Sequence, residues 1–328
     1  MNTKEKVLVT GANGFLATNA IAKLIEAGYE VRGLLRRKSS YIGKNYLELE
    51  LMEGSFTDVH TVRKALEGCR YVVHIAALTD QSASAEEYHK VNVEATVSLA
   101  QAAVEAGIKR FIYVSSANAF AYGSKDKPGD ETRPTREPFT HSQYALSKAA
   151  AQKEVLKFKD RMEVVVVNPT FMIGPMDIKP SSGRIITMAY GRWLMAAPPG
   201  GKNFVHVEDA ALGIVAAISK GHSGEAYLLC GENMSYRDFY RTLEKVSGKV
   251  MHLVNVPGKL LLAAGHICDL LYKIGIKTDA TLTNMKLLCI DNYYTNAKAR
   301  RDLGINFRST ETAVRDAVKW FRANNMLK

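Results

Sequence analysis

The stretch KVLVTGANGFLATNAIAKLIEAGYEVRGLLRRK, residues 6–38, decides the fold. It opens with a mostly apolar run at residues 6–10, which predicts a buried strand. Gly11 and Gly14 follow directly and lead into a predicted helix over residues 15–27. Glycines at this place let the chain turn tightly and let backbone N–H groups approach a pyrophosphate, which the positive end of the helix also attracts. A glycine pair often only marks a turn, but its position between the first strand and the first helix favours dinucleotide binding.

The end of the second predicted strand, residues 30–35, indicates which dinucleotide binds. A carboxylate at this position would accept hydrogen bonds from the adenosine ribose of NAD. The strand ends instead in Arg36, Arg37 and Lys38, and the next carboxylate is Glu48. A guanidinium can bind the 2′-phosphate of NADP through two hydrogen bonds. We therefore expect NADP(H), with Arg36 as the main contact, and NAD(H) as the less favoured cofactor. The alternative is a run of basic residues that is merely exposed after a strand.

Strand-like and helix-like segments alternate over the first 170 residues. Further strands are predicted at residues 47–52, 71–75, 111–115 and 164–168, and further helices at 59–66, 86–106 and 141–157. This order is typical of an α/β protein with a Rossmann-type, doubly wound parallel sheet.

The pattern changes after Pro169. Short strands are predicted at 204–207 and 226–230, and helices at 184–194, after Ser235 and at 311–324. We therefore expect a dinucleotide-binding domain over residues 1–170 and a smaller, mostly helical substrate lobe over residues 171–328. The two are interleaved, because no flexible linker separates them.

Tyr144 and Lys148 form the strongest catalytic candidate. They are four residues apart, so they share one face of a helix, and Thr140 with Gln143 matches a capping box that would start it. A free tyrosine has a pKa near ~10, which a neighbouring ammonium, helped by the positive charge of the cofactor, would lower. Tyr144 could then exchange a proton with a substrate oxygen during hydride transfer. Ser116, directly after the fifth predicted strand, is predicted to orient that oxygen. The alternatives are a surface Tyr–Lys pair and a serine that only ends a strand.

The bulk composition argues against several other classes. The 328 residues are 47% hydrophobic and 23% charged, as in ordinary globular proteins. The net charge of +11 is spread along the chain without the aromatic side chains that a single-strand binder needs, so no nucleic-acid partner is expected. The four cysteines match no zinc spacing, and no metal site is expected. The short polar start and the lack of a long apolar run favour a cytoplasmic protein that does not insert into membranes.

Together these segments resemble the extended short-chain dehydrogenase/reductase family, which includes the NAD-dependent epimerases and dehydratases. The resemblance is closest to its dihydroflavonol-reductase-like and 3β-hydroxysteroid-dehydrogenase-like branch, and it covers almost the whole chain. The matching motifs are TGANGFLA (10–17), VVHIAA (72–77), FIYVSS (111–116), YALSK (144–148), VNPTFMIGP (167–175), FVHVEDAA (204–211) and YYTNAKARRDLG (293–304).

The resemblance implies further site residues. Besides Tyr144 and Lys148, it implies cofactor contacts in the glycine turn, beside the adenine and on the nicotinamide side: Gly11, Asn13, Gly14, Phe15, Leu16, Phe56, Ile75, Ala76, Ala77, Pro169 and Thr170. It also implies that Asn92 braces the sheet, the alternative being an amide on a helix surface. Two residues depart from the family pattern: Ala17 replaces the usual third glycine, and Ser55 replaces an aspartate that contacts adenine.

The sequence is compatible with two classes of reaction. Arg36 favours an NADP(H)-dependent oxidoreductase that reduces a ketone or aldehyde, or oxidises a secondary alcohol, with Tyr144 as proton donor or acceptor. The alternative is a sugar-nucleotide epimerase or dehydratase that retains NAD. A non-catalytic dinucleotide sensor is disfavoured by the intact serine, tyrosine and lysine. The apolar stretches 260–276 and 282–290 favour a small apolar substrate, such as a steroid-like or aromatic ketone, although helix packing also explains them. The sequence leaves open whether the protein forms a homodimer.

Overall fold

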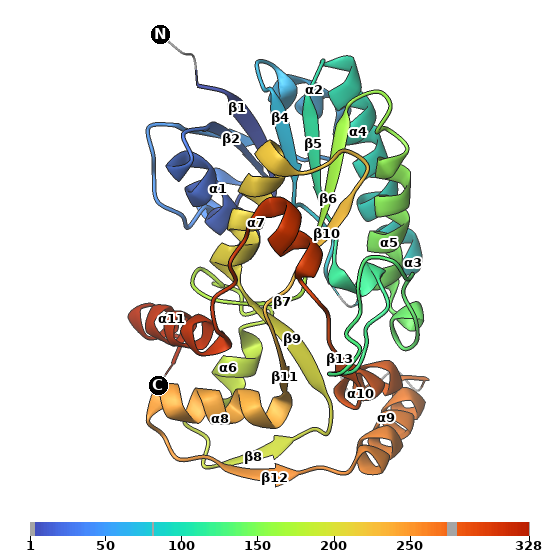
Figure 1. Ribbon diagram of the computed structural model, residues 1–328, viewed down its shortest axis with the longest axis vertical. Helices are drawn as coiled ribbons and strands as arrows, with labels where there is room; N and C mark the ends of the chain where they lie inside the picture. Colours follow the sequence, from blue (N-terminus) through green and yellow to red (C-terminus); the bar gives the residue numbers. More distant parts are fainter. Residues whose placement is uncertain (1–3, 81, 274–280, 328) are drawn as a thin grey trace.

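A parallel sheet of seven strands forms the upper lobe of the computed structural model, which describes residues 4–80, 82–273 and 281–327 (Figure 1). The strand order is β10-β6-β5-β4-β1-β2-β3. The strands are β1 (Lys6–Thr10), β2 (Glu30–Leu35), β3 (Leu49–Glu53), β4 (Tyr71–His74), β5 (Arg110–Val114), β6 (Glu163–Pro169) and β10 (Ala226–Leu229). The predicted Rossmann-type, doubly wound sheet is confirmed.

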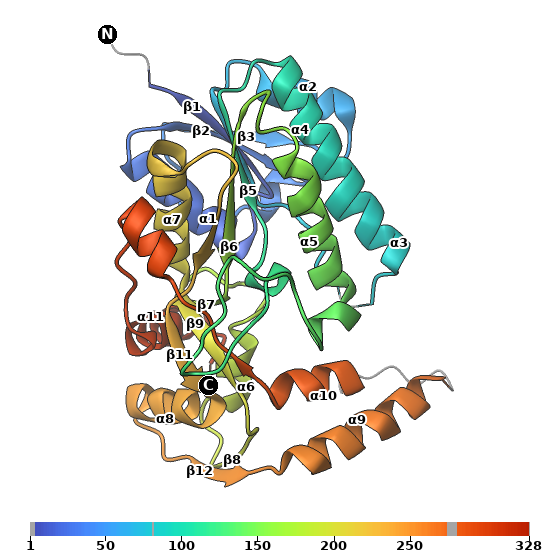
Figure 2. The same cartoon turned by 45° about the vertical axis from the view of Figure 1, so that its right-hand side comes forward.

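Helices cover both faces of this sheet, which explains why its central strands are apolar on both sides. Helices α1 (Phe15–Glu26) and α7 (Val207–Lys220) pack on one face. The opposite face is covered by α2 (Val59–Leu66), α4 (Ala95–Glu105) and α5 (Gln143–Leu156), with the short α3 (Ala85–Tyr88) at its edge (Figure 2). Because the seven strands are parallel, their carboxyl ends lie at one edge of the sheet, and this edge faces the lower lobe (Figure 1).

The lower lobe is built on a second, smaller sheet with its own apolar core. Strands β7 (Phe171–Ile173), β11 (Glu232–Ser235) and β13 (Asp291–Asn292) all pair with β9 (Gly201–His206), and β8 (Leu194–Ala197) pairs with β12 (His252–Asn255). The buried rings of Phe204, Phe239 and Phe321 form part of this core. The helices of this lobe are α6 (Arg184–Ala189), α8 (Tyr236–Ser247), α9 (Gly258–Lys273), α10 (Leu282–Leu288) and α11 (Thr310–Ala323).

The two lobes exchange elements. Helix α7 and strand β10 lie beyond residue 170 in the sequence, yet they pack into the upper lobe, where β10 pairs with β6 and α7 packs against α1. Residues 207–220 and 226–229 therefore belong to the upper lobe, although they follow residue 170 in the sequence.

Several predicted boundaries shift. The third strand begins at Leu49, because Leu47 is fully exposed. Helix α5 is capped by Ser142, whose hydroxyl accepts from the Ala145 N–H at 3.3 Å, and not by Thr140 as predicted. The helix predicted over 184–194 ends at Ala189. Of the apolar stretch 260–276, residues 274–276 lie outside the described residues.

Candidate active site

Ser116, Tyr144 and Lys148 lie together at the carboxyl end of strand β5. Ser116 lies two residues after the end of β5 and is buried, and its hydroxyl accepts a hydrogen bond from the Asn118 N–H at 3.2 Å. A hydrogen bond also joins the Ser116 hydroxyl to Tyr144, in the first turn of α5. Lys148, one turn further along α5, donates from Nζ to the Val114 carbonyl at 2.6 Å. The structure therefore brings the three residues of the predicted catalytic set to one place.

Lys148 is a buried cation that has no carboxylate partner among the residues that the structure describes. Its side chain is only 2% exposed, and its Nζ lies 4.6 Å from the centroid of the Tyr113 ring. Burial lowers the pKa of Lys148 from the usual 10.5 to about 7, because an ammonium loses hydration inside the protein. The Val114 carbonyl and the Tyr113 ring compensate only part of that loss.

Tyr144 holds its proton in this environment. Its ring is half-buried, and its centroid lies 6.4 Å from that of Tyr88 in an edge contact. Burial raises the pKa of Tyr144 to about 12, the neighbouring Tyr88 adds to the rise, and the hydrogen bond with Ser116 opposes it. This differs from the expectation that Lys148 would lower the pKa. Burial is the largest effect on the phenol, and a lysine with a pKa of about 7 no longer carries its charge at the high pH at which this phenol ionises. At neutral pH the phenol is therefore a proton donor.

Asn92 ties helix α5 to the loop after β4. Its Oδ1 accepts from the Leu78 N–H at 2.7 Å, and its Nδ2 donates to the Leu78 carbonyl and to the Ser147 hydroxyl, both at 3.0 Å. The residue is buried in a π-helical turn, His89–Glu94, which divides the helix predicted over 86–106. Such turns often occur at functional sites. Asn92 thus links two segments of the predicted site and is no surface amide.

Two further buried amides support Ser116, and the sequence analysis did not single them out. Asn168 on β6 donates from Nδ2 to the Ser116 carbonyl at 2.9 Å and to Gln152 Oε1 at 2.8 Å. The signal that could have found Asn168 is its polar side chain inside the apolar run VVVVNP, since a buried amide needs partners. Gln152 offers no comparable signal, because polar residues are ordinary on helices.

The glycine turn has the shape that a pyrophosphate needs. Gly11 has a φ of +70°, and a Cβ at this position would lie 3.0 Å from the Cα of Ala76. Gly14 begins α1 without a side-chain cap, which leaves the N–H groups of the first turn, from Phe15 and Leu16 onward, available to an anion. Asn13 is turned aside, with its Nδ2 donating to Ser40 Oγ at 2.8 Å. The turn therefore fits a dinucleotide.

A threonine and a histidine hold the nicotinamide-side loop beside this turn. The Thr10 hydroxyl accepts from the N–H groups of Ile75 and Ala76, both at 3.2 Å, and lies 2.7 Å from His74 Nδ1. The opposite ring nitrogen of His74 lies 2.9 Å from the Thr96 hydroxyl. Burial, and secondarily the charge of Lys148, lower the pKa of His74 to about 3. His74 is a neutral core histidine, as its apolar strand suggests, and it also positions this loop.

The remaining predicted cofactor residues are spread along the same edge. Arg36 is exposed at the end of β2, and no hydrogen bond or ion pair holds its side chain among the residues that the structure describes. The Phe56 ring packs on His74 with centroids 5.0 Å apart. Ala77 follows the loop residues held by Thr10, and Pro169 ends β6. The Thr170 hydroxyl is directed to the lower lobe, where it donates to Asn203 Oδ1 at 2.7 Å.

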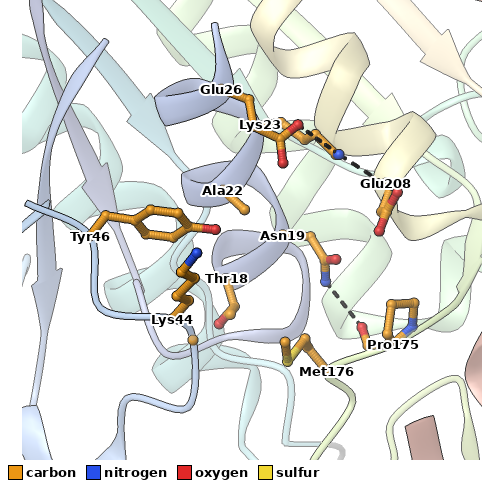
Figure 3. Close-up of a pocket in the computed structure, with 11 residues that line it drawn as sticks. Thr18, Asn19, Ala22, Lys23, Glu26, Lys44, Tyr46, Pro175, Met176 and Glu208 are labelled. Carbon is orange, nitrogen blue, oxygen red and sulfur yellow. Dashed lines mark hydrogen bonds and ion pairs between the residues drawn. The ribbon is translucent and has the colours of Figure 1, made fainter. Parts of the chain in front are cut away.

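A pocket of about 220 Å³ beside α1 is separate from this site (Figure 3). It lies between α1 and the segments around Tyr46 and Met176, and Lys23 crosses its rim to bind Glu26 and Glu208 at 2.9 and 3.8 Å. None of the predicted site residues lines it. Within the described part of the chain, no three His, Cys, Asp or Glu side chains gather to hold a metal, and no helix is both long and apolar enough to cross a bilayer.

The fold and the site together define an oxidoreductase that uses a nicotinamide dinucleotide. The chain belongs to the NAD-dependent epimerase/dehydratase family, whose model matches residues 7–230. It is similar to sterol demethylase protein B of Methylococcus capsulatus, with 32% identity over 98% of this chain and 99% of the relative. It is also similar to a putative dihydroflavonol 4-reductase of Synechocystis, with 30% identity over 98% of this chain and 95% of the relative.

A solved structure shows the same fold over the full length. The crystal structure of gox2253 has a TM-score of 0.85 and 32% identity, and the match covers 99% of this chain and 100% of that one. A 3-beta-hydroxysteroid dehydrogenase is a further relative. These likenesses confirm the predicted branch, and the protein is an NAD(P)-dependent oxidoreductase that acts on CH–OH groups.

Proposed function

We propose that the protein is an NADP(H)-dependent reductase that interconverts a ketone or aldehyde and the corresponding alcohol, with Tyr144 as the proton donor and acceptor. The observation that carries this proposal is the hydrogen-bonded pair of Ser116 and Tyr144 beside the buried Lys148. The pair lies at the same edge of the sheet as the Gly11 turn, so a substrate oxygen held by Ser116 would face the nicotinamide.

Each of the three side chains has a distinct role in the proposed reaction. NADP(H), when bound, supplies or accepts the hydride. In the reductive direction the Ser116 hydroxyl orients the carbonyl oxygen, and Tyr144 gives its phenolic proton to that oxygen as the hydride reaches the carbon. The carbonyl thus becomes an alcohol, and the negative charge left on Tyr144 is stabilised by the Lys148 ammonium. A proton from solvent then restores the phenol.

The preference for NADP(H) rests on Arg36. Its exposed guanidinium stands at the end of β2 without a protein acceptor among the described residues. The hydrogen bond between Asn13 and Ser40 ties the segment after Arg36 to the glycine turn, so a 2′-phosphate at this place would meet a guanidinium instead of a carboxylate.

The proposed substrate is a small molecule with an apolar, ring-containing body, of the steroid-like or aromatic kind. The names of the relatives refer to sterols and to a dihydroflavonol. In the lower lobe, several apolar side chains that pack against the core remain partly exposed, among them Phe171, Met234 and Leu288. Such side chains can contact an apolar body on the side of the site opposite the cofactor.

The variant Tyr144→Phe tests this function. It removes the proton-donating oxygen and keeps the ring that contacts Tyr88, so the protein should fold and bind NADPH normally. Turnover, followed by NADPH absorbance with a panel of ketones, should fall by about 10²–10⁴-fold, the usual contribution of a general acid. Turnover close to that of the wild type would show that the proton comes from elsewhere and would refute the proposed role.

A further inference from the structure

Helix α9 has an apolar face that no described part of the chain covers. Its other side packs on α10, since a Cβ on the buried Gly265 would lie 2.8 Å from the Leu282 Cα. A helix that is apolar on all sides is normally buried, so the exposed face of α9 is unusual for a protein that stays in water. The side chains of this face follow the three- and four-residue spacing of a helix, and the large ones are between 60% and 66% exposed: Leu260, Ala263, Ala264, Ile267 and Leu270.

The two-stranded sheet of β8 and β12 continues this apolar surface. Its parallel register sets residues of the two strands side by side on one face, and all four of them are exposed: Leu194, Ala196, His252 and Val254. Met195 and Leu253, which alternate with them along the strands, pack against the core of the lower lobe. The sheet thus has one covered face and one exposed face, and the exposed face is mostly apolar.

Trp193 lies just before β8, at the edge of the exposed face. Its ring packs on His252 with centroids 4.7 Å apart, yet the residue is 67% exposed. The indole combines an apolar ring with an N–H donor, so tryptophan is enriched where an apolar phase meets water.

These segments together form one end of the molecule. Figure 1 and Figure 2 both show β8, β12 and α9 at the lower end, and only residues 256–257 separate β12 from α9. Single exposed apolar side chains are normal, but here more than half of the large ones in the described part of the chain gather at one end, and such a group marks an interaction site. We call this group the basal surface, and it consists of Trp193, Leu194, Val250, Val254, Leu260, Ile267 and Leu270.

The charges beside the basal surface are positive. Residues 190–200 and 245–268, which carry it, contain one arginine and three lysines but no Asp or Glu. Of these basic residues, Arg192 and Lys259 are exposed directly beside apolar residues of the surface.

Two acids border these segments, and both have partners elsewhere. Asp269 is turned toward α10, where it accepts from the Leu282 N–H at 3.1 Å. Glu244 forms an ion pair with Arg241 at 2.6 Å and accepts from the Met251 N–H at 2.9 Å. The basal surface therefore combines exposed apolar side chains with a positive border.

We propose that the basal surface binds an anionic phospholipid bilayer, with α9 lying in the plane of the lipid headgroups. At 16 residues α9 is too short to cross a bilayer, but an apolar helical face with lysine and tryptophan beside it is typical of helices that lie on one. A second copy of the chain fits less well, because its own basal surface would add basic residues and no Asp or Glu to pair with them. The proposal goes beyond the proposed reaction and does not depend on it.

The test measures flotation of the full chain with lipid vesicles. One set of vesicles is pure phosphatidylcholine, and the other contains equal parts of phosphatidylcholine and phosphatidylglycerol. The apolar variant is Ile267→Ser with Leu270→Ser, and its matched control is Leu47→Ser with Val59→Ser, which changes two exposed apolar residues of the upper lobe.

The charge and the tryptophan are tested separately. Lys259→Gln removes one charge beside the surface, and Lys64→Gln, at an exposed position on α2, is its control. Trp320→Phe leaves Trp193 as the one tryptophan of the sequence, so its fluorescence reports contact with lipid on an unaltered basal surface. Calorimetric binding of NADPH shows that each variant is folded.

The wild type should float with the anionic vesicles and bind the neutral ones at least about fivefold more weakly, since each basic residue at an anionic surface contributes about that factor. The apolar double variant should bind at least about tenfold more weakly. Lys259→Gln should bind about fivefold more weakly at about 0.1 M salt, and this loss should shrink at about 1 M. Both controls should bind as the wild type does, and Trp193 emission should move to shorter wavelength and be quenched by brominated lipid.

Several results would overturn the proposal. These are no flotation with anionic vesicles, equal binding to both kinds of vesicle, full binding by the apolar double variant, or Trp193 emission that lipid leaves unchanged. A dimer that sedimentation detects in the wild type and not in the apolar double variant would assign the surface to a second copy instead. Tyr144→Phe should bind vesicles as the wild type does, so failure of the proposed reaction leaves this test intact.

Discussion

Replacing Lys148 by methionine should make the protein more stable at neutral pH while it abolishes turnover. The pKa of Lys148 is about 7 in the folded protein against an ordinary 10.5, and this gap corresponds to about 4–5 kcal/mol of burial cost for the ammonium. The methionine removes that cost. It also leaves the Val114 carbonyl without its donor, about 1–3 kcal/mol, and loses the cation contact with Tyr113, about 1–2 kcal/mol. The middle of these ranges gives an expected net gain of about 1 kcal/mol below pH 7.

The dependence on pH distinguishes this mechanism from improved packing. Because the pKa of Lys148 is depressed in the fold, the unfolded chain binds more protons between about pH 7 and pH 10.5, and the wild type gains stability as the pH rises through that window. The advantage of Lys148→Met should therefore be greatest below pH 7 and should shrink by about 1.4 kcal/mol for each pH unit above it.

Urea unfolding of both proteins at pH 6 and pH 9 measures this difference. The control is Lys153→Met, at an exposed position on the same helix, which should show no such change between the two pH values. A variant that is less stable than the wild type at pH 6, or one whose advantage is the same at both pH values, would refute the reasoning.

Three further predictions concern the cofactor. Arg36→Ala should weaken NADPH binding by about ten- to a hundredfold and leave NADH binding unchanged; equal loss for both, measured by calorimetry, would contradict the role of Arg36. Thr10→Val leaves the N–H groups of Ile75 and Ala76 without an acceptor, so it should lower the free energy of unfolding by about 1–3 kcal/mol and weaken NADPH binding, and Thr10→Ser should restore both. Purified protein should release little nucleotide on denaturation, because a reductase exchanges its cofactor every cycle; near-stoichiometric NAD would instead indicate the retained, slowly dissociating cofactor of an epimerase.

The fold was predictable because its signals are local. Continuous apolar strands alternating with helices define a doubly wound sheet, and the glycines at 11 and 14 mark where the first strand meets the first helix. The predicted ends of helices and strands were wrong where the local sequence pattern and the tertiary structure disagree. Leu47 is apolar but lies in solvent before β3, and Ser142 caps α5 although Thr140 matches the capping pattern better.

The site was predictable only in its motif residues. The spacing of Tyr144 and Lys148 on one helix follows from the sequence, but their pKa values depend on residues far along the chain. Tyr88 and Val114 reach them only through the fold. For the same reason the sequence did not reveal that, in the protein alone, burial raises the pKa of Tyr144.

The buried bases His74 and Lys148 form one electrostatic unit, although they come from different motifs. The Thr10 hydroxyl accepts from Ile75 and Ala76, so its own proton must go to His74 Nδ1, and Nε2 then donates to Thr96. A proton on Nδ1 would oppose the Thr10 proton and release the loop, and the charge of Lys148 opposes it as well. His74 is therefore held neutral both by its hydrogen bonds and by the neighbouring charge. In the proposed reaction, the neutral His74 therefore does not compete for the proton that Tyr144 would release, although it is buried close to the site.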